Sequence, residues 1–526
     1  MVADLFRALG RPDVLDLGNQ SHYFWAMLPE IVLALGAMGV LMVDVFQKGN
    51  RSEPSRANVA WLSLGSLVLA AVANLALVGV SDRSANGMVA VDHFRMITNF
   101  IYLGSAALAL FLAMGYLDRR GINRGEFHVL VLFATVGMML MGGARDLMLM
   151  FVGLEVMSVA IYVLVGFDRL DPRSSEGSLK YFLLGAFSSA FFLYGLALVW
   201  GTVGTTNVRG ISEAVLGGAA PFGAIFMAGM ALTLVGFAFK VAAMPFHMWT
   251  PDAYDGAPTP VTALMSTGVK AAAFAAFIRV FVVGFGGAIE SWQTAVVIIA
   301  TLTMFGANLI ALTEGSVKRM LAYSSIAHAG YLLVALSSSS QAGVAAFLFY
   351  LVVYTIMTAG AFGMVIANSR EDGEERVALE DWAGFASQKP WMAAFFSIFL
   401  LSLAGFPLTA GFLGKLFILR AAVEARLAPV AVLLVLASLI SYFYYLRVIV
   451  VMYMRPARSA DDHRHTWLPA PTRWAVGAAA VLVVGLFFFG SLPLRWAHEG
   501  AATLWRTEAG TAVVPPAQVG PVSTLR

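Results

Sequence analysis

The stretch that decides the fold is residues 232–273, which read LTLVGFAFKVAAMPFHMWTPDAYDGAPTPVTALMSTGVKAAA. Two apolar runs flank a polar, proline-rich centre, and each run carries one lysine, Lys240 or Lys270. Such runs are typical of membrane helices, although a charge at the bilayer centre costs about 2.5–3.5 kcal/mol. Pro245 follows Lys240 closely, and a proline removes a helical hydrogen bond. We therefore predict an interrupted membrane helix followed by a second one, with a titratable group in each.

The composition of the whole chain is that of a membrane protein. Of its 526 residues, 59% are hydrophobic and only 12% are charged, and the mean hydropathy is +0.79. A soluble protein carries about 25% charged residues, so a soluble multidomain protein is excluded. The net charge of +3, without a basic tract, argues against nucleic acid as a partner. The absence of cysteine excludes disulfides, iron–sulfur ligation by this chain and thiolate zinc sites.

Apolar runs long enough to cross a bilayer recur along the chain and predict an all-α polytopic membrane protein with about fourteen helices. Lysine and arginine favour cytoplasmic loops, and the odd-numbered loops hold 16 of them against 6 in the even-numbered loops. We therefore expect the odd loops in the cytoplasm and both termini on the periplasmic side. The expected segments are 24–45, 59–80, 95–116, 127–144, 147–167, 179–203, 222–248, 259–284, 289–312, 319–337, 341–367, 390–422, 427–453 and 472–494.

Four of the ionisable side chains inside these runs are the most informative. Besides Lys240 and Lys270 they are Glu155, in MFVGLEVMSVAIYVLVGF, and Lys415, in LSLAGFPLTAGFLGKLFIL. Left unpaired, the four would cost roughly 10 kcal/mol, so they must be paired or hydrated inside the bundle. A structural ion pair is the alternative, but one carboxylate cannot neutralise three ammonium groups. The surplus predicts lysines that are held neutral or share protons, and a line of such groups can pass a proton along.

Two further residues have two interpretations each. Lys180, in SSEGSLKYFLLGAFSSAFFLYG, is either a lysine that extends to the membrane surface or part of a relay. His328, in KRMLAYSSIAHAGYLL, is either a core histidine bonded to Ser324 or Ser325 or part of a relay.

The polar stretch after Pro245 contains two carboxylates, Asp252 and Asp255, with no base nearby in the sequence. It joins the seventh and eighth segments on the expected cytoplasmic side. It either shapes a proton entrance or forms a rigid turn that caps the eighth helix.

A second interruption, Gly405-Phe-Pro407, precedes Lys415 in the twelfth segment. Interrupted helices five segments apart are typical of an internally repeated transporter, with two unrelated kinks as the alternative. Because five is odd, two five-helix copies enter the membrane from opposite sides, and the repeat is inverted. The predicted organisation is a three-helix segment (1–126), a first five-helix bundle (127–284), a second, inverted five-helix bundle (289–453), and a C-terminal helix with a loose external tail (454–526, the tail from Trp496).

The stretch FKVAAMPFHMWTPDAYDGAPTPVTALMSTGVKAA resembles the proton-translocating signature of the antiporter-like subunits of respiratory complex I and of multisubunit cation/proton antiporters. Within that family, the chain is most similar to the subunit N group of bacterial NADH-quinone oxidoreductases. A lysine rather than a glutamate on the twelfth helix, the stretch SLKYFLLGAFSSAFFLYG and the length support this. The resemblance covers roughly residues 24–495, and it implies fourteen helices with two inverted bundles.

The resemblance also implies roles for the candidate residues. Glu155 and Lys240 match a coupled pair in the first bundle. Lys270 matches a central relay lysine and Lys415 an exit-side lysine in the second bundle. Lys180 matches a lysine of the family's sixth helix, and His328 matches a position that varies more among family members.

The resemblance further implies a proton-translocating subunit of an NADH:quinone oxidoreductase in the bacterial inner membrane. This chain would bind no cofactor, because NADH, FMN, the iron–sulfur clusters and quinone belong to other subunits. Its partners would be a neighbouring antiporter-like subunit, the small quinone-side subunits and the lipid bilayer. Two alternatives remain: a subunit of a multisubunit cation/proton antiporter, and a membrane scaffold that moves no protons.

Overall fold

The computed structural model consists almost entirely of helices. It describes residues 2–8, 10–12, 14–15, 20–47, 54–82, 87–217, 223–370, 374–457 and 469–505. Two short strands, β1 (Val14–Leu15) and β2 (Ser81–Asp82), pair in parallel. The helices are α1 (Val2–Ala8), α2 (Gln20–Ala26), α3 (Leu28–Gln47), α4 (Pro54–Leu75), α5 (His93–Ala113), α6 (Tyr116–Arg119), α7 (Gly125–Gly143), α8 (Leu147–Val165), α9 (Pro172–Val203), α10 (Val208–Leu216), α11 (Ala224–Lys240), α12 (Thr250–Gly256), α13 (Thr259–Leu264), η1 (Met265–Val269), α14 (Lys270–Phe277), η2 (Ile278–Gly284), η3 (Gly286–Ala288), α15 (Ile289–Ala311), α16 (Val317–Ser337), α17 (Gln341–Ala367), η4 (Leu379–Trp382), α18 (Phe385–Gln388), α19 (Pro390–Ala404), α20 (Ala410–Glu424), α21 (Ala428–Met454), α22 (Ala470–Phe488) and α23 (Ser491–Thr503).

Twelve helices in the described part of the chain are long and apolar enough to cross a membrane. Two shorter apolar helices, α11 and α19, lie where the interrupted seventh and twelfth segments were predicted. The prediction of an all-α polytopic membrane protein is therefore confirmed. The count of about fourteen spans and the inverted repeat stay predictions.

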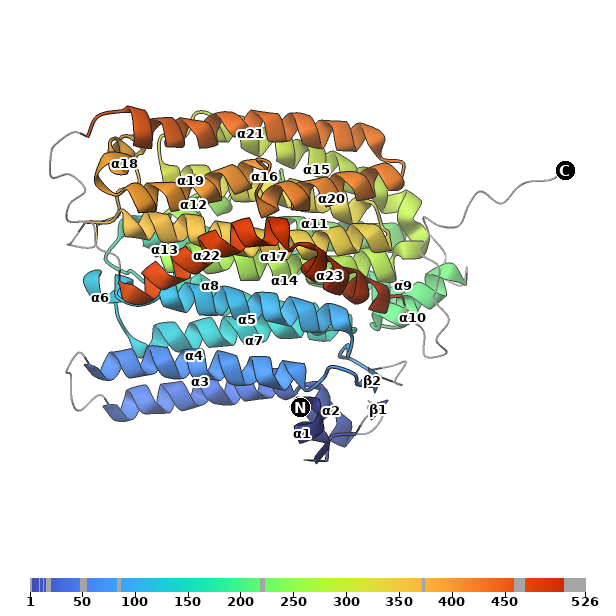
Figure 1. Cartoon of the computed structure of the whole chain (residues 1–526). Helices are drawn as coiled ribbons and strands as arrows, with labels where there is room; N and C mark the ends of the chain where they lie inside the picture. Colours follow the sequence, from blue (N-terminus) through green and yellow to red (C-terminus); the bar gives the residue numbers. More distant parts are fainter. Residues whose placement is uncertain are drawn as a thin grey trace.

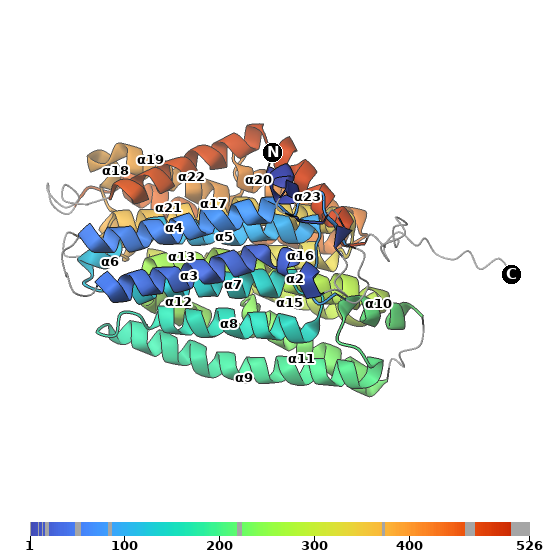
Figure 2. The same ribbon diagram turned by 90° about the horizontal axis from the view of Figure 1, so that it is seen from below.

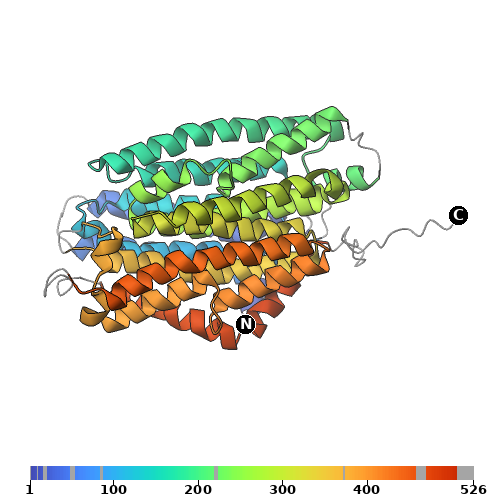
Figure 3. The ribbon, with the colours of Figure 1, turned by 90° about the horizontal axis from the view of Figure 1, so that it is seen from above.

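The long helices run side by side along one direction of the molecule (Figure 1). α6 and α18 lie at one end, here called the α6 end; α10, α23 and the N-terminal helix α1 lie at the other, the α10 end. Seen from below, α9 and α11 form one edge of the bundle, while α19 and α22 form the opposite edge (Figure 2). From above, α21 lies across the near face (Figure 3).

The burial of the helices separates an interior from a lipid-type surface. Every residue of the apolar window of α16 is buried, and the helix that runs from α13 to η2 is almost as enclosed. By contrast, α9 exposes Leu183 and Phe187, and α21 exposes Leu439 and Phe443. Large apolar side chains on outer faces are what a bilayer accommodates. The interior helix α16 is therefore where polar groups need internal partners.

Each interruption leaves helical carbonyls that other groups satisfy. The seventh segment, expected at 222–248 with an interruption, is helical in α11 as far as Lys240. Ala242 follows with a φ of +61°, a strained value for a residue with a side chain. The indole of Trp249 donates to the carbonyl of Phe239 at 3.1 Å. The helix thus ends five residues before Pro245, and a side chain from beyond the proline satisfies one of its last carbonyls.

The twelfth segment, expected at 390–422, is two helices rather than one. α19 ends at Ala404, Gly405 adopts a φ of +85°, and α20 begins at Ala410. Glycine pays no steric penalty in this left-handed conformation. The break therefore falls where the sequence Gly405-Phe-Pro407 predicted it.

The C-terminal expectation was wrong in part. Residues from Trp496 onward were predicted to be a loose tail, but α23 continues to Thr503. The Thr503 hydroxyl accepts a hydrogen bond from the backbone N–H of Phe94 at 3.3 Å, which anchors α23 on the start of α5. Packing against α5 and α17 stabilises a segment whose composition alone did not indicate a helix. Residues 506–526 lie outside the described part.

Candidate functional site

Lys240 is buried at the C-terminal end of α11, against α8 and α9. Its Nζ donates hydrogen bonds to Ser158 Oγ at 2.8 Å and to Tyr162 OH at 3.3 Å. The same nitrogen lies 5.5 Å from the centre of the Tyr162 ring and 6.0 Å from that of Tyr181. Neutral hydroxyls and aromatic faces thus take the place of water around this ammonium group.

Glu155 lies on the same side of α8 as Ser158 and Tyr162, three and seven residues before them. It is half-buried, and its Oε1 is enclosed without a hydrogen-bond partner among the described residues. Its charge attracts Lys240, yet the hydrogen bonds of Lys240 go to the two hydroxyls. The predicted pair therefore comes from two helices, α8 and α11, and it interacts through space.

Lys270 is buried at the start of α14, directly after the π-helical turn η1. Its Nζ donates to the backbone carbonyl of Ser325 at 2.7 Å and to Ser325 Oγ at 2.5 Å. Ser325 Oγ also accepts a hydrogen bond from Tyr354 OH at 2.9 Å. π-helical turns occur frequently at functional sites, and here one directly precedes the lysine.

His328 is buried on α16, three residues after Ser325. Its Nδ1 lies 2.5 Å from Tyr350 OH, and its Nε2 lies 3.3 Å from Tyr445 OH. One of the two interpretations had His328 bonded to Ser324 or Ser325, but its partners are the two tyrosines, while Ser324 bonds to Tyr445 and Ser325 to Lys270 and Tyr354. The histidine is thus part of a tyrosine cluster.

Lys415 lies on α20 and reaches across the interruption to the end of α19. Its Nζ donates to the backbone carbonyls of Leu403 at 3.0 Å and Ala404 at 2.8 Å. The last carbonyls of a helix have no intrahelical partner and carry partial negative charge. The nitrogen also lies 4.8 Å from the centre of the Tyr331 ring. A cation is therefore favoured here without any carboxylate.

The predicted residues fall into two groups and one outlier. Lys240 and Glu155 form the first group, on α11 and α8. Lys270, His328 and Lys415 form the second group, in which both lysines act electrostatically on the histidine. In the described part of the chain, none of the three lysines has a carboxylate within ion-pair distance; their partners are neutral oxygens.

Lys180 is the outlier, because it belongs to a charge cluster at the α6 end. Its Nζ lies 2.6 Å from Glu176 and 2.7 Å from Asp252, and Arg319 reaches Asp252 at 3.1 Å. Burial alone would raise the pKa of Asp252, but the hydrogen bonds from Lys180 and Arg319 lower it overall. Basic side chains from α9 and α16 thus contact the carboxylate of Asp252, which has no base nearby in the sequence.

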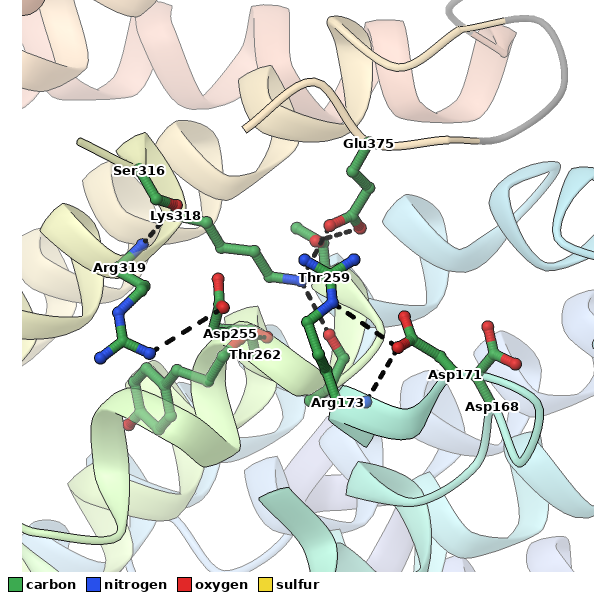
Figure 4. A network of polar contacts seen from close by, with 12 residues as sticks. Asp168, Asp171, Arg173, Asp255, Thr259, Thr262, Ser316, Lys318, Arg319 and Glu375 are labelled. Atoms are coloured by element: carbon green, nitrogen blue, oxygen red, sulfur yellow. Dashed lines mark hydrogen bonds and ion pairs between the residues drawn. The ribbon is translucent and has the colours of Figure 1, made fainter. Parts of the chain in front are cut away.

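A second cluster at this end surrounds Lys318 (Figure 4). Its buried Nζ donates to the carbonyl of Ala257 and to Glu375 Oε2, both at 2.8 Å. Glu375 also accepts hydrogen bonds from Tyr116 OH at 2.7 Å and from the Thr259 hydroxyl. Burial raises the pKa of Glu375, but the charge and hydrogen bond of Lys318 outweigh it and lower the pKa overall.

At the opposite end, one buried ion pair joins the start of α5 to the eighth segment, and a second joins α5 to α3. Arg279 forms two hydrogen bonds of 2.9 Å with Asp92, and Arg95 pairs with Glu30 at 2.7 Å. Burial raises the pKa of Asp92, but Arg279 outweighs it and lowers the pKa to about 2. Glu30 is enclosed near the start of α3, where Arg95 is its ion-pair partner.

Sequence reasoning missed most of the partners of the lysines. Ser158 and Tyr162, like Tyr350 and Tyr354, are hydroxyl residues four positions apart in apolar helices. Such spacing puts both side chains on one face of a helix, so it could have indicated these hydroxyl partners from the sequence. Arg279 was also visible, as an arginine within an expected span.

Comparison with known proteins identifies the family of this chain. Residues 144–441 match the family described as NADH:quinone oxidoreductase/Mrp antiporter, TM. The chain is 44% identical over 475 residues to an NADH-quinone oxidoreductase subunit N of Trichlorobacter lovleyi, covering 90% of this chain and 96% of the relative. It is 45% identical over 490 residues to a subunit N 1 of Sorangium cellulosum, covering 88% and 96%.

Two solved structures are similar to this chain over most of its length. A chain of respiratory complex I from Thermus thermophilus shares 35% identity with a TM-score of 0.74, covering 89% of this chain and 98% of that one. A chain of the Mrp complex from a Dietzia species has a TM-score of 0.77 at 23% identity, which shows a shared fold alone; 91% of this chain and 97% of that one are covered. On this evidence the chain belongs to the NADH-quinone oxidoreductase subunit N family of antiporter-like membrane proteins.

Proposed function

We propose that the chain is a proton-translocating membrane subunit of an NADH-quinone oxidoreductase, with quinone reduction in partner subunits as the energy source. The observation that carries the proposal is the solvation of Lys240, Lys270 and Lys415 by neutral oxygens. A buried ammonium group without a counter-ion gains and loses its proton at modest cost, whereas an ion pair locks it in the charged form.

In the first group, Glu155 is the control element. While ionised, it attracts the proton on Lys240 through space. Protonating Glu155, or moving negative charge away from it, removes that attraction, and Lys240 then gives up its proton toward Lys270 and Lys415. Because Glu155 is half-buried on an outer helix, a charge on a neighbouring antiporter-like subunit has access to it.

In the second group, the proton passes through hydroxyl and imidazole groups. Ser325 bonds to both Lys270 and Tyr354, and His328 contacts Tyr350 and Tyr445. A hydroxyl donates one hydrogen bond while it accepts another, and a neutral imidazole does the same with its two nitrogens. Lys415, at the interruption of the twelfth segment, is the exit-side group. Lys180, which belongs to neither group, is assigned to a proton entrance at the α6 end.

The orientation and the assembly follow from the same proposal. The excess of basic residues in the odd loops places the α6 end in the cytoplasm, with both termini on the periplasmic side of the bacterial inner membrane. The two interruptions, each next to a lysine, support two inverted five-helix copies at 127–284 and 289–453. NADH, FMN, iron–sulfur clusters and quinone are assigned to partner subunits, which include the small quinone-side subunits.

The test is to purify the native complex that contains this chain. Flavin and iron–sulfur absorbance, with NADH:quinone activity coupled to proton uptake in vesicles, is the expected result. Sodium-dependent proton exchange without these chromophores would instead establish an antiporter subunit, the alternative that the matching family description also names. A pure scaffold predicts normal assembly and unchanged pumping in both Lys240→Ala and Glu155→Ala.

A further inference from the structure

Glu375 is a loop residue that reaches into the helix bundle. It lies in the connection between α17 and η4, yet only 12% of its side chain is exposed. Its carboxylate contacts groups on three separate elements: Tyr116 on α6, Thr259 on α13 and Lys318 on α16. A surface loop needs no such buried acid to remain in place, so the position of this carboxylate calls for a functional explanation.

The Glu375–Lys318 pair borders a polar pocket of about 210 Å³ at the α6 end. Charged side chains dominate its wall, and Arg173 and Glu374, which also line it, are more than half exposed. Figure 4 shows Asp168, Asp171, Arg173, Asp255, Lys318 and Glu375 around this region. Water from the α6 side therefore has a charged route to the Glu375 carboxylate.

Below Glu375, a row of hydroxyls follows one face of the eighth segment. Thr259, Thr262 and Ser266 precede Lys270 at spacings of three, four and four residues, and all four side chains are buried. Neighbours at such spacings have Cβ atoms about 5–6 Å apart, a gap that one water molecule bridges. The eleven residue-to-residue steps from Thr259 to Lys270 span about 16 Å, roughly half the thickness of the hydrocarbon core.

Each end of this row makes a direct hydrogen bond to a group beyond it. The Thr259 hydroxyl donates to Glu375, and Lys270 donates to Ser325 in the relay interior. Thr262 and Ser266 donate to backbone carbonyls of Tyr254 and Ala263, so their oxygens keep lone pairs that can accept a proton. The row thus runs from the polar pocket to the central lysine.

We propose that Glu375 is the proton-loading residue for Lys270, and that Thr259, Thr262 and Ser266 are the hydroxyl row that carries the proton inward. This inference rests on the proposed function. The Glu375 carboxylate takes a proton from water in the pocket. It passes that proton to the Thr259 oxygen, each hydroxyl releases its own proton inward, and the neutral Lys270 amine accepts the last one. Because Lys318 favours the ionised form of Glu375, the carboxylate is ready to accept a proton and does not retain it.

The first test uses Glu375→Gln, which keeps the side-chain shape but removes the proton-carrying carboxylate. The readout is NADH-driven proton uptake per NADH oxidised, measured on the native complex in vesicles. We expect about a 100-fold loss, the lower end of the range for removal of a proton-transfer group, with partial recovery in Glu375→Asp. The matched control is Glu374→Gln, because Glu374 is adjacent and exposed and pairs with Arg370 at the surface.

The second test removes the row without touching a charge. Thr262→Val and Ser266→Ala together are expected to reduce proton uptake several-fold. Ser63→Ala is the control, since Ser63 is equally buried and bonds to a carbonyl of its own helix, α4. Complex content, checked by NADH oxidation with a soluble electron acceptor and by native gels, should match the wild type in every variant.

The outcomes separate this inference from the proposed function. If Lys270→Ala abolishes proton uptake while Glu375→Gln and the hydroxyl variant leave it at the wild-type level, the loading role is wrong and the relay stands. If Lys270→Ala also leaves it unchanged, the proposed function itself fails. A loss in Glu375→Gln that is matched by an equal loss of assembled complex, with no recovery in Glu375→Asp, would assign Glu375 a structural role and overturn the inference.

Discussion

Around Lys240, the oxygens that accept hydrogen bonds are side-chain hydroxyls, whereas around Lys415 they are backbone carbonyls. Lys240 is also attracted by the carboxylate of Glu155, one helical turn before Ser158 on α8. By contrast, the charged groups that act on His328 are two cations, Lys270 and Lys415. A hydroxyl rotates and finds another partner, but a carbonyl at a helix end is fixed. The first site is therefore suited to control by a change of charge, and the second to holding and delivering a proton.

The largest effect that tests this comparison is loss of either lysine. Lys240→Ala and Lys415→Ala are each expected to reduce NADH-driven proton uptake about 100-fold, because removing a positioned proton-transfer group typically costs a factor of 10²–10⁴. Fluorescent pH indicators in vesicles report the uptake. Lys389→Ala, in a loop of the α6 end, is the control. Full pumping by either variant would remove that lysine from the relay.

The stability of these two variants should differ. Lys415→Ala leaves the carbonyls of Leu403 and Ala404 without their donor, and each unsatisfied buried group costs about 1–3 kcal/mol. In Lys240→Ala, Ser158 keeps its hydrogen bond to the carbonyl of Leu154. We therefore expect Lys415→Ala to unfold at the lower temperature in thermal melts of the purified complex. Equal melting temperatures would contradict the proposed difference between the two sites.

Glu155 should behave as a control element and not as a structural ion pair. Glu155→Gln is expected to lower proton uptake about 10-fold, since it removes the charge that acts on Lys240. Assembly should stay normal, because no hydrogen bond to Lys240 is lost. Glu155→Asp should recover part of the activity. A variant complex that fails to assemble would indicate that Glu155 holds the helices together.

The smallest effect is expected at Tyr162. Tyr162→Phe removes the longer of the two hydrogen bonds of Lys240 and keeps the aromatic face. A typical hydrogen bond contributes about 0.5–1.5 kcal/mol, so proton uptake should fall roughly twofold to tenfold. Stopped-flow uptake measurements resolve this range. A loss as large as that of Lys240→Ala would show that the hydroxyl is itself an essential proton carrier.

The membrane class of the protein could be predicted because it depends on composition and on local runs of residues. Apolar length, the position of Pro245 and the pair Gly405 and Pro407 act within one or two helical turns, so the sequence displays them directly. The extent of the helices was less predictable. α11 ends before residue 248, and α23 continues past Trp496, because packing against distant segments determines where each helix ends.

The candidate residues were visible for the same reason: a charge within an apolar run stands out in the sequence. Their partners were not, since Lys270 meets Ser325 across fifty-five positions, and Lys180 meets Asp252 across seventy-two. Glu375 is the clearest case, because its loop position suggested nothing until the structure placed it against Lys318 and Thr259.

The sequence by itself determined that the chain enters the bilayer, where its two interruptions lie and which ionisable groups must be accommodated inside it. Hydrophobicity and helix sterics are local, so these features follow from neighbouring residues. Only the tertiary structure decided which oxygens accept hydrogen bonds from each lysine and whether a carboxylate stands nearby. Those contacts join helices far apart in the chain, and they set the electrostatic environment in which a buried ammonium group keeps or gives up its proton.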